Sequence, residues 1–330
     1  MSEKLISACL IVKNEEAVLS RCLDSIRGLW DELIIVDTGS TDRTVDIAQD
    51  YGANVLHYEW VAPGNKGSAR NFGIAAAVSQ WIVVIDADEV MINAPQARKD
   101  ILAADSGDAI QVQFNNFERE QINLSWKQVR IFKRCKYVYK YREHEIPVAQ
   151  IENPIVYDSY MIIEHRAPDD RQQTKSAPMI ARLALDVEEN PTDPHPLYFY
   201  HRQCAINGQN EKAIELGQQY LELTKSGGFI QADIYNNMAT AYSNLGNLFE
   251  AQKMMHLAAA CEPYKREWLY RLAVLYENGQ QWNIALAMLR AAAELLPNEE
   301  RQWEPLTTTR IYELIDICQR EMAHSHEHTH

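Results

Sequence analysis

Short apolar runs alternate with amphipathic segments through the N-terminal part of the chain. Residues 5–12, 32–36, 54–58 and 81–85 are apolar runs, mostly rich in β-branched side chains, and each has the length of a buried strand. Between them, residues 18–26, 43–51 and 65–78 have the composition or apolar spacing of helices. This alternation predicts an open, mostly parallel α/β sheet covered by helices.

The same domain continues with a more mixed pattern. Residues 92–104 predict a helix that lies over the sheet, and residues 109–117, 128–133 and 155–164 predict further strands. We therefore expect one α/β domain over residues 1–170.

Past residue 170 the strand patterns stop and amphipathic helices begin. Two copies of an Ala-, Tyr- and Leu-containing pattern end in Pro263 and Pro297, 34 residues apart, which is the tetratricopeptide period. A degenerate earlier copy contains Leu197, Tyr200, His201, Cys204 and Ala213. We expect an all-α, tetratricopeptide-type repeat domain over residues 171–330, with a capping helix at 307–322 and a disordered His-rich tail.

Composition limits the possible partners and location. The formal net charge of −14 argues against a nucleic-acid partner. No apolar run approaches the roughly 20 residues of a membrane span, and no signal peptide precedes the first strand. Six scattered cysteines without a C-x-x-C pair indicate reduced thiols in a cytoplasmic protein.

Charged residues stand where the predicted parallel strands end. Asp37 follows the second strand, and Asp86 and Asp88 follow the fourth, at the edge where open α/β sheets bind ligands. Two neighbouring carboxylates repel each other unless a cation lies between them, and hard oxygen ligands suit Mg²⁺ or Mn²⁺. The helix that begins near residue 65 adds first-turn amides, Lys66 and Arg70, which together predict an anion site. The edge as a whole predicts a nucleotide site with a divalent metal.

Segments at these positions resemble family 2 glycosyltransferases with the GT-A fold. They are Ile11–Glu15, Val36–Asp42, Ser68–Asn71 and Asp86–Glu89, and they follow the family's order and spacing over about the first 170 residues. The resemblance implies a Rossmann-like GT-A domain that binds a nucleotide sugar, with a UDP-sugar expected. It implies donor contacts by Val12, Asn14, Glu15, Asp37, Arg70, Asp86, Ala87 and Asp88.

The resemblance also implies individual roles in the donor site. Asp37 would recognise the nucleotide base, and Arg70 would lie against the nucleotide. Asp88, with Asp86, would hold the cation that bridges the diphosphate. His165 fits by position as a third metal ligand or a diphosphate contact.

The segment Tyr141–Pro147 resembles the acceptor-activating motif of a tetratricopeptide-bearing branch of the family. An inverting transfer needs a group that accepts the proton of the attacking acceptor. We expect Glu145 to be this base, with His144 as the alternate base or an orienting partner. Glu143 adjoins both, and the sequence does not rank the three.

These features predict an inverting, metal-dependent glycosyltransferase. The domain arrangement is similar to that of peptide glycosyltransferases that modify bacteriocin precursors, which implies a peptide or protein acceptor. A cell-envelope polysaccharide or lipid-linked glycan acceptor stays open, as does a non-catalytic scaffold that only binds nucleotide. The repeats would hold a peptide or protein in their concave groove or join two copies as a homodimer.

Overall fold

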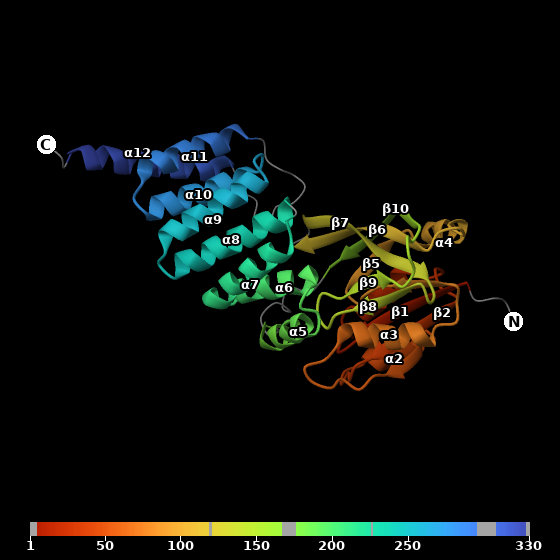
Figure 1. Ribbon diagram of the computed structural model, residues 1–330. Helices are drawn as coiled ribbons and strands as arrows, with labels where there is room; N and C mark the ends of the chain where they lie inside the picture. The colour runs from red at the N-terminus through yellow and green to blue at the C-terminus, as the bar shows by residue number, and fades with distance from the viewer. Residues whose placement is uncertain (1–4, 119–120, 167–175, 226, 296–307, 328–330) are drawn as a thin grey trace. The chain divides into compact units, whose positions relative to one another are not determined.

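The computed structural model describes residues 5–118, 121–166, 176–225, 227–295 and 308–327 (Figure 1). The chain forms two compact units, residues 1–182 and 183–330. The division falls within helix α5 (Ser176–Glu189). The boundary expected at residue 170 lies outside the described residues, so it stays a prediction.

An eight-stranded mixed sheet forms the centre of the first unit, in the order β3-β2-β1-β4-β7-β6-β10-β5. Its strands are β1 (Ile6–Val12), β2 (Glu32–Asp37), β3 (Asn54–His57), β4 (Trp81–Val84), β5 (Glu89–Ile92), β6 (Ala109–Glu118), β7 (Gln121–Lys133) and β10 (Val156–His165). The strands β3, β2, β1 and β4 are neighbours in this order and run parallel to one another. Strand β7 is antiparallel to both of its neighbours, β4 and β6. The predicted GT-A-type α/β fold is confirmed, with a sheet that is parallel on one side and mixed on the other.

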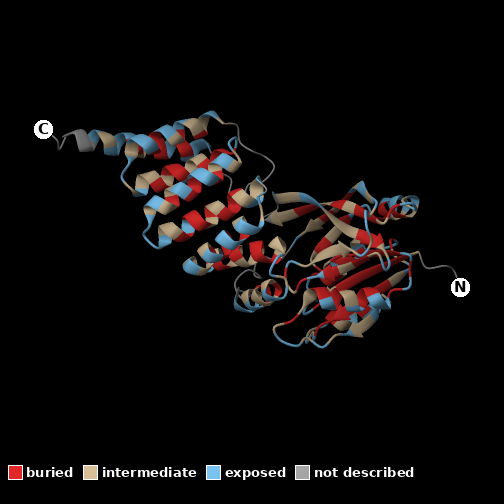
Figure 2. Cartoon of the chain, viewed as in Figure 1, coloured by how far each residue is buried: buried red, intermediate tan, exposed pale blue. Residues whose placement is uncertain are grey.

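Helices cover both faces of this sheet, as the buried central strands require (Figure 2). One core contains side chains of α1 (Leu19–Ser25), α2 (Thr44–Asp50) and α4 (Ala94–Ala103). The other contains α3 (Lys66–Ala76) and the small ribbon of β8 (Tyr137–Lys140) and β9 (Ile146–Ala149). Within β1, Leu10 belongs to the first core and Cys9 to the second, because neighbouring strand residues point to opposite faces.

Strand β5 was not expected from the sequence. It pairs antiparallel with β10, and its first residue, Glu89, lies opposite His165. Four residues are too few to show a period-two pattern, so this strand is defined by its partner.

Paired helices form the second unit, and the predicted helical repeat fold is confirmed. They are α6 (Pro194–Ile206), α7 (Asn210–Leu223), α8 (Phe229–Asn244), α9 (Leu248–Cys261), α10 (Arg266–Asn278), α11 (Trp282–Glu294) and α12 (Thr308–Glu327). The small repeat residues are almost fully buried where helices meet: Ala239, Ala251, Ala258, Ala273, Ala285 and Ala292.

The C-terminal tail differs from the expectation in one respect. Helix α12 extends to Glu327, so residues 324–327, expected to be disordered, are helical. No glycine or proline interrupts the chain there, and the helix simply continues. Residues 328–330 lie outside the described residues.

All six cysteines are free thiols, and Cys9, Cys22, Cys204 and Cys318 are buried. Across the described ranges, every helix is too short or too polar to cross a lipid bilayer.

Candidate active site

The loops after β1 and β2 are tied to each other by hydrogen bonds. The side-chain oxygen of Asn14 accepts from the Thr41 amide at 2.8 Å, and Ser40 Oγ accepts from the Asn14 amide at 3.0 Å. The Glu15 amide donates to Thr44 Oγ1 at 2.7 Å. Asn14 has a φ of 56°, a left-handed conformation that these bonds support. The two loops thus form one rigid edge.

Asp37 is buried at this edge, beside Val12 in the parallel register. Its carboxylate accepts hydrogen bonds from the amides of Gly39 (3.2 Å) and Ser40 (3.0 Å), and His57 Nδ1 lies 3.5 Å away. Asp37 therefore shapes its own turn. Its expected role in base recognition, and the donor contacts of Val12, Asn14 and Glu15, stay predictions.

The expected anion site at the start of α3 is wrong. The amides of Lys66 and Gly67 donate to the carbonyls of Arg142 (3.3 Å) and Tyr141 (3.2 Å), and the side chain of Asn65 caps the following turn (2.8 Å). A Cβ on Gly67 would lie 2.6 Å from the Tyr141 carbonyl oxygen, so the close approach requires glycine. The first turn of α3 thus binds the loop of residues 141–145.

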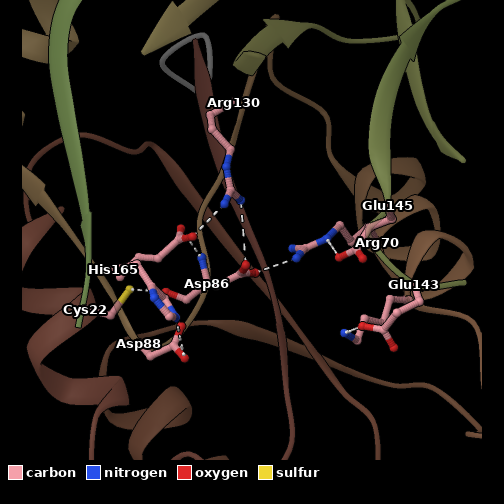
Figure 3. Close-up of polar contacts among 10 residues, drawn as sticks. Cys22, Arg70, Asp86, Asp88, Arg130, Glu143, Glu145 and His165 are labelled. Atoms are coloured by element: carbon pink, nitrogen blue, oxygen red, sulfur yellow. Dashed lines mark hydrogen bonds and ion pairs between the residues drawn. The ribbon is translucent and has the colours of Figure 1, made fainter. Parts of the chain in front are cut away.

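A chain of ion pairs joins the end of β4 to the expected catalytic base (Figure 3). Arg70 lies 2.6 Å from Asp86 Oδ1 through Nη2, and its Nε donates to Glu145 Oε1 at 2.9 Å. Arg130 lies 3.7 Å from Asp86 Oδ2 and 2.6 Å from Glu89 Oε1. The side chains of Arg70 and Glu145 are only 7% and 8% exposed, which makes their pairing hard to break.

The two carboxyl groups next to Arg130 have opposite pKa shifts. Burial alone would raise the pKa of Asp86, but Arg70 and Arg130 outweigh it and lower the pKa to about 2. Burial raises the pKa of Glu89 to about 7, against the opposing charge of Arg130. Asp86 is therefore a permanent anion at neutral pH.

Asp88 and His165 face each other on the other side of this segment. His165 Nε2 lies 3.3 Å from Asp88 Oδ2, and its Nδ1 lies 2.7 Å from Asn116 Oδ1. The hydrogen bond to Asp88 raises the pKa of His165. A carboxylate oxygen and an oriented imidazole nitrogen fit Mg²⁺ or Mn²⁺, since phosphate oxygens and water commonly complete such sites.

The predicted trio Asp86, Asp88 and His165 is not assembled as one cluster. Among the described residues, no group of three or more His, Cys, Asp or Glu side chains is arranged to hold a metal ion. The Asp86 carboxylate is held by Arg70 and Arg130 instead. Its metal-binding role stays a prediction.

Hydrogen bonds from two other segments fix the backbone between Asp86 and Asp88. Cys22 Sγ donates to the Asp86 carbonyl at 3.2 Å, and the Arg166 amide donates to the Asp88 carbonyl at 3.0 Å. Ala87 between them is buried. This anchoring fixes the backbone that carries Asp88, and the donor contact expected of Ala87 stays a prediction.

We call residues 141–147 the acceptor loop. Its three adjoining titratable residues, Glu143, His144 and Glu145, have different surroundings in the structure. Glu143 is 3% exposed and is ion-paired with Lys66 and Arg182. His144 is exposed, and Glu145 is paired with Arg70. A structural role is favoured for Glu143, which leaves Glu145 and His144 as candidate bases.

Four residues of the site were not expected from the sequence: Glu89, Asn116, Arg130 and Arg182. One of them, Asn116, could have been predicted from the sequence. Val112 and Phe114 on β6 are buried in one core, and Asn116 continues that alternation with a polar side chain. The contacts of Arg130 and Arg182 depend on segments far apart in sequence, for which no local pattern exists.

Comparison with known proteins assigns a family to most of the first unit. Residues 7–169 match the model described as Glycosyl transferase family 2. The chain carries a family 2 glycosyltransferase domain. Arg182 lies outside the matched residues, whereas the other residues of the candidate site lie within them.

Individual relatives extend over parts of the chain. A TPR repeat-containing protein of Synechococcus elongatus is 49% identical over 87 residues, which are 26% of this chain and 21% of that protein. The SPbeta prophage-derived glycosyltransferase SunS of Bacillus subtilis is 26% identical over 64% of this chain and 51% of its own length. The chain thus spans between about a fifth and about half of these curated relatives. Among solved structures, S. aureus TarS 1–349 in complex with UDP is 11% identical, covering 76% of this chain and 91% of that one, with a TM-score of 0.45.

Proposed function

We propose that the protein is an inverting glycosyltransferase that transfers a sugar from a UDP-sugar to a peptide or protein side chain. The ion-pair chain Asp86–Arg70–Glu145 within a family 2 domain is the observation that carries the proposal. Through Arg70, this chain connects Asp86, in the segment that would bind the donor diphosphate, to Glu145, a carboxylate suited to activate the acceptor. The glycosyltransferase name of SunS supports the same reaction class.

Asp88 and His165 would hold the cation, and Asn116 would orient the imidazole. When bound, Mg²⁺ or Mn²⁺ offsets the negative charge that develops on the departing nucleoside diphosphate. Arg70 engages one oxygen of Glu145, Oε1, and fixes the direction of the carboxylate.

The other oxygen, Glu145 Oε2, has no hydrogen-bond partner among the described residues, and it would take the proton of the attacking acceptor. The acceptor attacks the anomeric carbon opposite the leaving group in a single displacement, which gives inversion.

A groove of about 990 Å³ in the second unit supports a peptide acceptor. Carboxamides of Asn236, Asn237 and Asn278 line it, and each can pair with both N–H and C=O groups of an extended chain. Both carboxylate oxygens of Glu267 are buried in its wall with no hydrogen-bond partner in the described part of the chain. These oxygens are as closed to a bound chain as they are to water, so the three carboxamides would make the hydrogen bonds to it.

Other assignments are compatible with parts of these observations. A cell-envelope polysaccharide or lipid-linked glycan acceptor would use the same donor site without the groove. A nucleotide-binding scaffold would use the groove without turnover, and a homodimer would use the repeats for self-association. We place the reaction in the cytoplasm, where six free cysteines stay reduced.

Release of a nucleoside diphosphate tests the function directly. The full chain is incubated with a panel of UDP- and GDP-sugars plus Mn²⁺, with EDTA or with the Asp88→Ala variant in parallel. We expect hydrolysis of a UDP-sugar that EDTA abolishes and that Asp88→Ala slows at least about 100-fold, because several kcal/mol of charge stabilisation are lost. Asp50→Ala, an exposed carboxylate at the end of α2, is the matched control.

Synthetic peptides with Ser, Thr or Cys then serve as acceptors in the same assay. Sugar transfer to lipid-linked glycan but to no peptide would contradict the proposed acceptor. Nucleotide binding without hydrolysis of any donor in the panel would favour the scaffold.

A further inference from the structure

A buried cluster of charges anchors the acceptor loop to two helices. The Glu143 carboxylate accepts a hydrogen bond from Arg182 Nε at 2.7 Å, and Arg182 Nη2 lies 2.6 Å from the same oxygen. Lys66, at the start of α3, forms an ion pair with the other oxygen of Glu143. Arg182 Nη1 donates to the Pro63 carbonyl at 3.0 Å. We call Lys66, Glu143 and Arg182 the loop brace.

The loop itself has a backbone that needs external restraint. Tyr141 and His144 have φ angles of 72° and 50°, in the left-handed region that residues other than glycine seldom adopt. Such conformations persist when surrounding contacts fix them. The first amides of α3 hold the carbonyls of Tyr141 and Arg142, and the loop brace holds Glu143. The chain is thus anchored immediately before His144 and Glu145.

We propose that Arg182 is a positioning residue for His144 and Glu145, acting through Glu143. Its side chain is 9% exposed, and that of Glu143 is 3% exposed, so loss of the arginine leaves a buried carboxylate with one cation fewer. Glu143 would then move toward water and carry its neighbours with it. Arg182 lies outside residues 7–169, so its role is not part of the family match.

This inference rests on the proposed function only for its effect on the reaction rate. The restraint of the loop is a property of the fold and has its own readout. Arg182 lies on α5 at the last position of the first unit, so every member of the loop brace belongs to that unit.

Hydrogen exchange of the full chain measures the restraint. For Arg182→Met we expect exchange in a peptide covering residues 140–147 to become about tenfold faster or more, while peptides of β1 and β4 change less than about twofold. Arg182→Lys keeps the charge but loses the bond to Pro63 and should produce a smaller rise. Arg27→Met, which removes an exposed pair with Asp24, is the matched control and should change neither region.

Steady-state hydrolysis of the UDP-sugar that the wild type cleaves fastest measures the consequence for catalysis. We expect Arg182→Met to lower kcat by about 10- to 100-fold with a donor KM within about twofold, because a displaced base affects the chemical step and not donor binding. Arg182→Lys should recover part of the loss. Where Arg182→Met does not fold, Arg182→Lys and Glu143→Gln provide the comparison.

The outcomes separate this proposal from the proposed function. Unchanged exchange at residues 140–147, or faster exchange throughout the first unit, overturns the positioning role. Faster loop exchange with unchanged kcat overturns it as well. A wild type that hydrolyses no donor counts against the proposed function, and loop exchange alone then decides whether Arg182 restrains the loop.

Discussion

Asn116 and Asp88 each contact one ring nitrogen of His165. The carboxamide oxygen of Asn116 can only accept, so Nδ1 carries the hydrogen of this 2.7 Å contact and Nε2 faces Asp88. Without a cation, the contact with Asp88 raises the pKa of His165, so a metal ion has to compete with a proton for Nε2. Asn116 fixes the ring so that Nε2 is the nitrogen presented to a metal ion beside Asp88.

We therefore expect Asn116→Ala to weaken Mn²⁺ binding by about 10- to 100-fold, the usual effect of removing an outer partner of a metal-bound histidine. Titration calorimetry of Mn²⁺ in the presence of UDP measures it. Gln113 lies on β6, the strand that also carries Asn116, and Gln113→Ala, which removes a 2.6 Å hydrogen bond to Ser125 on β7, is the control. Equal Mn²⁺ affinity of the Asn116 variant and the wild type would show that His165 needs no orienting partner.

At the scale of elements, the packing of α6 against α7 explains a buried histidine. His201 is fully buried, and its Nδ1 donates to the Ala213 carbonyl at 2.7 Å. Its Nε2 is buried without a hydrogen-bond partner among the described residues. A Cβ on Gly217 would lie 3.0 Å from the His201 ring, so glycine lets the helix approach this closely. The imidazole is neutral in the folded state, because burial lowers the pKa of His201.

This gives the second unit an acid-sensitive stability. As pH falls through the ordinary histidine pKa of about 6.5, His201 is protonated in the unfolded chain but stays neutral in the folded chain. The free energy of unfolding therefore decreases. Urea unfolding followed by far-ultraviolet circular dichroism from about pH 7.5 to about pH 5 should show this loss in the wild type and a flatter profile in His201→Gln. His256→Gln, on an exposed ring, serves as control. Parallel profiles for His201→Gln and the wild type would refute the assignment.

Elements also show what the sequence can and cannot predict. The alternation of apolar runs and amphipathic segments predicted α1, α2, α3 and most strands of the sheet, and the abrupt ends of apolar runs predicted Asp37, Asp86 and Asp88 at strand ends. Strand β5 has four residues without a clear period, and it forms because its distant partner β10 is present. The contacts of Glu143 with Arg182 and of Glu89 with Arg130 join residues 39 and 41 positions apart, which local patterns do not record.

At the scale of the whole molecule, the two units have separate hydrophobic cores. The buried clusters of the first unit contain residues up to Ile163, and those of the second begin at Leu197. Each core is large enough to unfold as a cooperative unit of its own. We therefore expect two thermal transitions for the full chain.

A ligand bound to one unit should stabilise only that unit. UDP with Mn²⁺ at about 100 times its Kd adds about 2.7 kcal/mol to the folded state, which corresponds to a shift of about 5–10 °C for a unit of this size. Calorimetry should show this shift in one transition only, and hydrogen exchange at increasing temperature should assign it to β1, β2 and β4. EDTA or Asp88→Ala should abolish it. Equal shifts of both transitions would mean that the units unfold together, and the absence of any shift would mean that the first unit does not bind the nucleotide.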